Sequence, residues 1–327
     1  MVQRILLILL MLTSLPLCAE EHPSFEPERY NIVFENDYFI QTDRWYTAGI
    51  DFSFLYKLHF DDIVALPFSD EQALSYFDLS LSLEMYTPEE FDNPDPQPDD
   101  RPYAGWLYSS FALHQSSAKS LDSLELQLGI VGPSAMAEQI QRFVHEHIIG
   151  DPVDGWQHQL KDEAGINLAY HHHERLQFTS GRYASVLIPR IGGVLGNVRS
   201  ELDFGLLYRR GVNIPRDFGQ NFMVTPGLDS AVPALNRGEW KPKAVLSYYL
   251  QLQGDLRVVG RDIFLQGNSR KSSLSVDPCP VVARAGGGFG GAYSNAQLSL
   301  LYTAESRSFA KQRTIHGYAS LLFSYAY

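Results

Sequence analysis

The stretch IDFSFLYKL, residues 50–58, alternates apolar and polar side chains along its whole length. In an extended chain Ile50 and Phe52 lie on one face, whereas Asp51 and Ser53 lie on the other. Alternation with a period of two predicts a β-strand with one apolar face. A tilted strand needs about 9–11 residues to cross a bilayer, and this stretch is close to that length.

The same alternation recurs in four further segments: 77–85, 124–130, 201–209 and 319–327. A soluble β-sandwich also alternates. Two features favour a membrane barrel: the apolar faces nearly lack charge, and aromatic residues recur near strand ends, with Tyr327 finishing the chain. Because open strand edges cannot exist in hydrocarbon, the sheet must close on itself.

The sequence therefore predicts an all-β fold, a closed antiparallel transmembrane β-barrel of about twelve strands that forms a single domain. The segment 211–242 is the least certain part of this strand count. It is rich in Pro, Gly and Asn and falls on the periplasmic side, where loops are normally short. It holds either an ordered flap or an unrecognised strand pair. The twelve strands are expected to begin near residues 29, 47, 74, 104, 122, 165, 182, 200, 243, 259, 295 and 316.

The N-terminus has the features of a secretory signal peptide, residues 1–19. A basic Arg4 precedes a short apolar run, and Leu17-Cys18-Ala19 precedes Glu20. The apolar run is shorter than the about 20 residues of a spanning helix. A lipoprotein modified at Cys18 is the alternative. Cleavage after Ala19 would leave the domain 20–327 with Cys279 alone, which excludes an internal disulfide.

The bulk composition limits the partners. The net charge is −12, with 45% hydrophobic and 13% aromatic residues. Nucleic acid is excluded, because binding its phosphates requires a basic surface.

Three polar residues flank the first two predicted strands. Asn36 and Asp37 follow the first strand, and Thr47 precedes the second. Carboxylate and amide oxygens are typical ligands of calcium; the alternative is a polar hairpin loop rich in turn formers. In regular strands Thr47 and Asp37 would face the lumen and Asn36 the lipid. For Asn36 and Asp37 to reach one site, the first strand must bulge or end there.

The segment 134–150 changes to a helical period, with Ser134 as a candidate N-cap and Gly150 as a candidate stop. This short amphipathic helix lies in an extracellular loop and is expected to pack on the barrel rim or lumen. Gln141 and His145 are four residues apart and share one face. A neutral histidine can serve as a general base; the alternative is a surface histidine.

These segments resemble the LpxR-like lipid A 3'-O-deacylases of bacterial outer membranes. The resemblance rests, in the expected order, on residues 34–49, on GIVGP at 129–133, on the Gln-x-x-x-His step at 141–145 and on GWQHQL at 155–160. It covers most of residues 30–176, with a weaker continuation at LLYRRG, residues 206–211.

The resemblance implies an outer-membrane carboxylic ester hydrolase with Ca²⁺ as cofactor and lipid A or lipopolysaccharide as substrate. His145 would be the general base and Gln141 would orient its ring. Thr47 would position water or substrate by a hydrogen bond, and Asn36, Asp37 and Asp151 would hold the metal. The family usually has glycine four residues after its histidine, whereas Gly150 follows His145 by five, so His147 stays open as the base.

The loop 86–101 is acidic, which is unexpected for a phosphorylated lipid A. Either Ca²⁺ or Mg²⁺ bridges substrate and loop, or the substrate lacks phosphate there. A phospholipase on the same scaffold and a non-enzymatic, porin-like barrel are therefore the alternative functions.

Two other motifs do not indicate a site. His171, His172 and His173 are consecutive, and consecutive strand residues point to opposite faces, which disfavours a metal cluster. Neither a lysine nor a helical pattern follows the glycine-rich stretch 286–291, so it is expected to relieve packing or bend a strand rather than bind phosphate.

Overall fold

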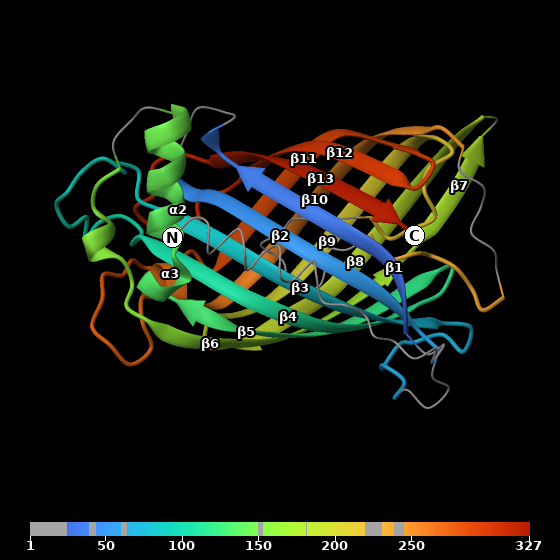
Figure 1. Ribbon diagram of the computed structural model, residues 1–327, viewed down its shortest axis with the longest axis horizontal. Helices are drawn as coiled ribbons and strands as arrows, with labels where there is room; N and C mark the ends of the chain where they lie inside the picture. Colours follow the sequence, from blue (N-terminus) through green and yellow to red (C-terminus); the bar gives the residue numbers. More distant parts are fainter. Residues whose placement is uncertain are drawn as a thin grey trace.

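The protein forms one antiparallel sheet that closes into a barrel (Figure 1). The computed structural model describes residues 25–38, 44–59, 64–149, 153–180, 182–219, 231–238 and 245–327. The strands are β1 (Phe25–Asn36), β2 (Trp45–Leu58), β3 (Leu74–Thr87), β4 (Ala104–Ser116), β5 (Ser120–Val131), β6 (Glu163–Glu174), β7 (Leu176–Ser180), β8 (Tyr183–Gly196), β9 (Arg199–Val212), β10 (Ser247–Asp262), β11 (Val281–Tyr293), β12 (Ala296–Glu305) and β13 (His316–Ala326).

β6 and β7 act as a single barrel strand. Both pair with β8, and the register is the same on either side of the break, since His173 pairs with Arg190 and Leu176 with Leu187. Pro189 lies opposite the break and has no amide N–H to donate. The barrel is thus twelve-stranded, as predicted.

One predicted strand start is wrong. Val259 lies inside β10, and the next strand is β11, which begins at Val281. β11 contains the glycines of 286–291, which carry no side chains and therefore hide the alternation that marks a strand. The other starts fall within a few residues of the observed ones.

The two faces of the wall are as the alternation predicts. Leu202 and Phe204 are exposed on the outer face, whereas Glu201 and Asp203 are buried in the lumen. The start of β1 and the end of β13 lie side by side at one end of the barrel. There Tyr30 stacks on Tyr325, with ring centroids 5.4 Å apart. Outer-membrane barrels place their termini in the periplasm, so the opposite end, with the loops that contain α2 and α3, is extracellular.

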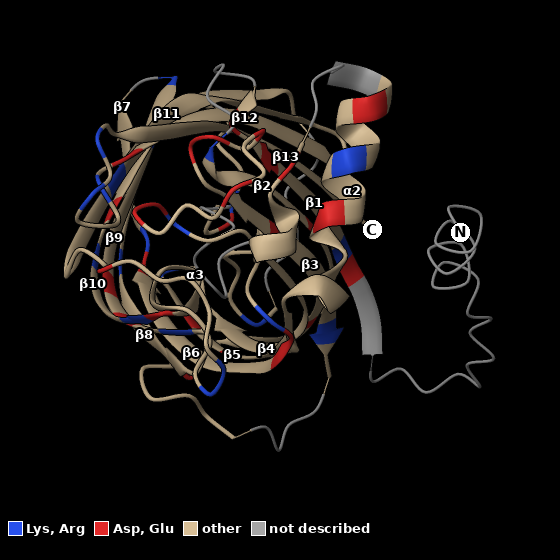
Figure 2. Ribbon diagram, turned by 90° about the vertical axis from the view of Figure 1, so that its left-hand side faces the viewer, with Lys and Arg blue, Asp and Glu red and all other residues tan. Residues whose placement is uncertain are grey.

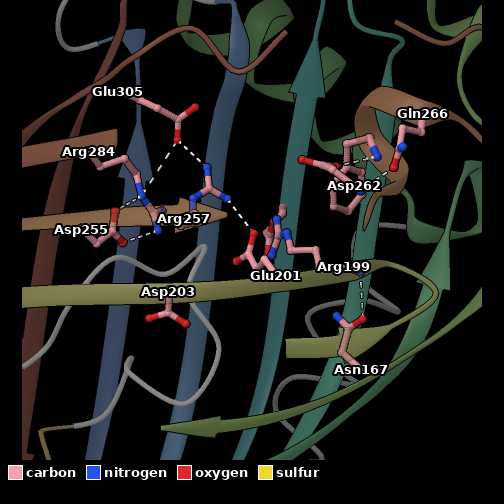
Figure 3. Close-up of polar contacts among 12 residues, drawn as sticks. Asn167, Arg199, Glu201, Asp203, Asp255, Arg257, Asp262, Gln266, Arg284 and Glu305 are labelled. Carbon is pink, nitrogen blue, oxygen red and sulfur yellow. Dashed lines mark hydrogen bonds and ion pairs between the residues drawn. The ribbon is translucent and has the colours of Figure 1, made fainter. Parts of the chain in front are cut away.

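Buried ion pairs in the lumen connect neighbouring strands and also strands on different sides of the barrel (Figure 3). Arg284 bonds Asp255 through two nitrogens at 3.0 and 2.6 Å, and Arg190 bonds Asp203 at 2.9 Å. Arg199 bonds Glu84 at 2.6 Å. These groups are buried, and pairing compensates part of the large cost of desolvating them.

Packed clusters occupy both ends of the lumen. At the extracellular end the short helix α3 (Ile263–Gln266) folds inward, and Phe264 stacks on Tyr86 at 4.3 Å. At the periplasmic end Phe218 and Val232 pack against inward-facing strand residues such as Leu55. Of the two alternatives for segment 211–242, the ordered flap is confirmed in its described parts, 213–219 and 231–238.

The consecutive histidines of β6 divide between the faces as expected. His171 and His173 are fully buried in the lumen, where His171 bonds Asp203 at 2.8 Å. His172 lies on the other face and contacts Phe68.

The longest described helix, α2 (Ala137–Val144), stands outside the ring of strands (Figure 2). Within the described ranges, none of the helices has the length and apolar content required to cross a membrane.

Candidate active site

Helix α2 begins at a left-handed residue rather than at the predicted serine cap. Met136 has φ 64° and precedes Ala137, whereas Ser134 lies in a preceding 3₁₀ turn, Pro133–Ala135. The Ser134 hydroxyl and amide donate to the two carboxylate oxygens of Asp162. Ser134 thus anchors the turn to the loop that leads into β6, and the capping prediction was wrong.

The helix covers the outer wall at the extracellular ends of β2–β4. Leu83, on the outer face of β3, is only 4% exposed. Leu79 lies on the same face, four residues earlier and farther from the helix, and is 37% exposed. A Cβ atom at Gly105 of β4 would lie 2.6 Å from Cβ of Ala137, so the glycine permits this close approach. The helix was expected to pack on either the barrel rim or the lumen. It packs on the outer side of the rim.

The predicted helix face with Gln141 and His145 is turned inward, and both side chains are 3% exposed. Trp156, from the loop that follows, donates its indole N–H to Oε1 of Gln141 at 2.8 Å. The His145 ring meets the Phe91 ring edge-on at 5.6 Å. The helix therefore holds an imidazole and an amide against the barrel wall.

His147, the alternative base, has a different environment. It is exposed, its Nδ1 lies 2.9 Å from the carbonyl of Phe143, and its ring stacks on Phe143. This geometry favours His145 over His147 as the residue that faces the site.

His145 opens a π-helical turn, His145–Ile149. Such a turn takes one residue more than an α-helical turn and often occurs at functional sites. The sequence has one residue more between His145 and Gly150 than the family pattern, and the π-helical turn gives a physical account of that insertion.

The tips of β1 and β2 bring the other predicted residues together. β1 ends at Asn36, which is one of the two predicted ways for Asn36 and Asp37 to reach the same site. The Asp37 amide donates to the Thr47 carbonyl at 3.1 Å, and the Arg44 amide donates to Asp37 Oδ2 at 2.5 Å. Asp37 is buried, and the Asn36 amide oxygen accepts from the Tyr38 amide at 2.7 Å.

Thr47 does not follow the regular alternation that placed it in the lumen. The register between β2 and β3 shifts between Tyr46 and Ala48, so Thr47 is the extra residue of a bulge. Tyr46 packs in the lumen and Ala48 under the helix, and the Thr47 hydroxyl bonds that of Thr87 at 2.7 Å.

The two groups of residues share the outer wall. Asn36 pairs with Ala48, which belongs to the same apolar cluster as Ala137 of α2 and Trp156. Figure 1 shows α2 beside the extracellular tips of β1–β3. The sixth metal or catalytic candidate, Asp151, lies outside the described residues.

The acidic loop between β3 and β4 uses several of its carboxylates internally. Glu89 pairs with Arg44, and Asp99 pairs with Lys311. Asp100 accepts the amides of Glu89 and Arg101, and burial raises the pKa of its carboxyl. The acidity of the loop is therefore largely structural and does not argue against a phosphorylated substrate.

The donor chemistry of this corner fits calcium. Asn36 and Asp37 offer hard amide and carboxylate oxygens, the ligand type that Ca²⁺ prefers. In the described part of the chain no group of three or more His, Cys, Asp or Glu side chains could hold a metal. Asp151, main-chain carbonyls, water and substrate oxygens would then complete the shell.

Three contact residues of the site were not predicted: Trp156, Phe91 and Thr87. Trp156 lies in the GWQHQL stretch that carries the family resemblance, which was the available signal. Phe91 and Thr87 carry no sequence signal, because their roles arise from the packing of separate loops.

The closed sheet with its apolar outer face defines an outer-membrane β-barrel, and its candidate site lies under α2 on the outer wall. A family model described as "Outer membrane protein LpxR" matches residues 5–327, and the chain belongs to that family. Membership places the protein in the bacterial outer membrane, in a family of lipid A deacylases.

One solved structure shows the same fold. LpxR from Salmonella typhimurium is 18% identical with a TM-score of 0.73, over 91% of this chain and 100% of that chain. The β domain of the Bordetella autotransporter BrkA is 11% identical with a TM-score of 0.43, over 93% and 99% of the two chains. No curated protein matches the sequence.

Proposed function

We propose that the protein hydrolyses the 3'-linked acyl ester of lipid A, with His145 as general base and Ca²⁺ as cofactor. The observation that carries this proposal is the buried face of Gln141 and His145, held by Trp156 against the outer wall. At this position the scissile ester of an outer-leaflet lipid reaches the site without leaving the membrane.

His145 would accept a proton from a water molecule as that water attacks the acyl carbonyl carbon. The bond between this carbon and the 3'-oxygen then breaks, and the proton passes from His145 to the leaving oxygen. The products are a free fatty acid and a 3'-hydroxyl group.

Gln141 would position the water beside the ring. Its Oε1 is engaged by Trp156, and its Nε2 is buried without a hydrogen-bond partner among the described residues. Leaving such a donor unsatisfied costs about 1–3 kcal/mol. A water or an ester oxygen bound next to His145 would recover this energy.

Asn36 and Asp37, with Asp151, would hold Ca²⁺, and Thr47 would donate or accept a hydrogen bond to water or substrate. When bound, the ion would polarise the carbonyl and stabilise the developing negative charge.

The alternatives have less support. A porin needs an open lumen, whereas packed clusters occupy both described ends of this one. The acidic loop favoured the phospholipase alternative, but the carboxylates of Glu89, Asp99 and Asp100 are engaged by Arg44, Lys311 and main-chain amides.

Mass spectrometry of lipid A tests the proposal. The detergent-purified barrel is incubated with lipid A in calcium and in excess chelator. We expect loss of the 3'-linked acyl group in calcium only. Unchanged lipid A in calcium, with phospholipid cleaved instead, would establish the phospholipase.

A further inference from the structure

An apolar groove of about 430 Å³ runs along the outer wall where β11, β12, β13 and β1 lie side by side. Figure 1 shows these four strands adjacent to one another on the barrel. The sides of the groove are formed by large exposed side chains, Phe289, Leu300 and Tyr302. Its floor is formed by small residues, Gly287 and Ala319.

The groove leads directly to the candidate active site. Gly287 pairs with Tyr302, Tyr302 with Ala319, and Ala319 with Asn36. The same row continues through Ala48 to the wall under α2. The groove thus approaches Asn36 from the side opposite the helix.

The glycine creates the groove, and the fold does not require it. Gly287 has no positive φ. A Cβ atom there would meet only the flexible end of Leu252, at 3.0 Å, and main chain at 3.6 Å. A larger side chain would fit the backbone and project into the groove.

We infer that this groove holds the fatty acyl chain of the ester that is cleaved, an inference that rests on the proposed function. The groove faces hydrocarbon in the extracellular half of the wall, where an outer-leaflet lipid has its chains. An acyl chain gains no hydrophobic energy on leaving lipid for a wall as apolar as lipid itself. The groove therefore acts by alignment, fixing the carbonyl between Asn36 and His145.

The test fills the groove and varies the chain. Gly287→Leu is compared with wild type and with Ala283→Leu, which adds the same side chain at an exposed outer position of β11 outside the groove. Acyl release is measured on lipid A carrying long or short 3'-linked chains in mixed micelles. Heat-modifiable migration verifies that each barrel is folded.

We expect Gly287→Leu to lower kcat/KM on the long-chain substrate roughly ten-fold or more, because alignment is lost. Its activity on the short-chain substrate and all activities of Ala283→Leu should stay near those of wild type. Equal loss on both chain lengths, or no loss, would overturn the inference.

A binding measurement separates this inference from the proposed reaction. Native mass spectrometry counts lipid A molecules retained by His145→Ala with and without Gly287→Leu. Retention that Gly287→Leu abolishes supports the groove even if wild type releases no acyl chain on any substrate. Retention that Gly287→Leu leaves unchanged contradicts the groove even if wild type is active.

Discussion

The lumen and the outer wall under α2 both bury polar side chains, but they do so in different ways. In the lumen guanidinium groups face carboxylates, as Arg284 faces Asp255 and Arg199 faces Glu84. Under the helix, an imidazole faces the Phe91 ring, and the Gln141 amide has a buried N–H₂ with no partner among the described residues.

The difference indicates two tasks. Ion pairs such as those of Arg284 and Arg199 link strands of the barrel and thereby hold it together. A buried amide N–H₂ such as that of Gln141, at a surface that faces lipid, is costly for stability, and such groups mark functional sites. Substitutions in the two regions test whether the lumen serves stability and the outer wall serves chemistry.

His145→Ala should have the largest effect. Removing a general base lowers turnover by about 10²–10⁴-fold. Acyl release from lipid A is measured by mass spectrometry, on barrel whose folding is checked by heat-modifiable migration. His147→Ala is the matched control and should retain activity, since that side chain is exposed and bonds its own helix. The opposite ranking of the two variants would assign the base to His147.

Gly105→Val should have the next largest effect. Its Cβ would lie 2.6 Å from Cβ of Ala137 and 3.1 Å from that of Ala135, so α2 must move away from the wall. A displacement of this kind is expected to lower turnover by about 10–100-fold. Faster proteolysis within the loop, with an intact barrel, would accompany the loss. Full activity would show that contact between helix and wall is dispensable.

Trp156→Phe keeps most of the ring packing and removes the hydrogen bond to Gln141. An acceptor left buried and unsatisfied costs about 1–3 kcal/mol, so we expect roughly a ten-fold fall in kcat/KM. In the Gln141→Ala variant, the additional Trp156→Phe substitution should not change kcat/KM, because the two residues would act as one unit. Additive losses would argue against that coupling.

Thr47→Val should have the smallest effect. It removes a hydroxyl bonded to Thr87 and preserves the shape of the bulge. The loss of one neutral hydrogen bond, about 0.5–1.5 kcal/mol, corresponds to a few-fold change in turnover. Turnover is measured with calcium near saturation and below it. Loss of a metal ligand would raise the calcium concentration required for turnover, whereas loss of the Thr47 hydrogen bond should not.

Much of the fold was predictable from the sequence, because one physical pattern determines it. A strand with lipid on one side and a polar lumen on the other must alternate, as residues 50–58 and 201–209 do. The pattern fails where residues lack side chains, which is why β11, with its glycines, was missed. Segment 211–242 was recognised as irregular, but the position of its described parts in the lumen depends on Phe218 and Val232 packing against apolar residues of distant strands.

The candidate site was predictable in its residues more than in its geometry. The spacing of Gln141 and His145 gave their shared face, and the resemblance suggested their roles. The side of the wall on which they lie could not be derived, since the outward apolar residues of β2 and β3 suit lipid and a covering helix equally well. The bulge at Thr47 likewise depends on the pairing of β2 with β3, which no local pattern specifies.

The division of tasks is tested most directly by measuring stability and turnover on the same preparations of Arg284→Met and His145→Ala. Breaking the buried pair of Arg284 with Asp255 should lower the free energy of unfolding in urea by about 3–5 kcal/mol. The protein that stays folded should keep its kcat for acyl release. His145→Ala should leave the unfolding transition nearly unchanged and lose turnover. If Arg284→Met lost turnover while folded, or His145→Ala kept it, the assignment of chemistry to the outer wall would be contradicted.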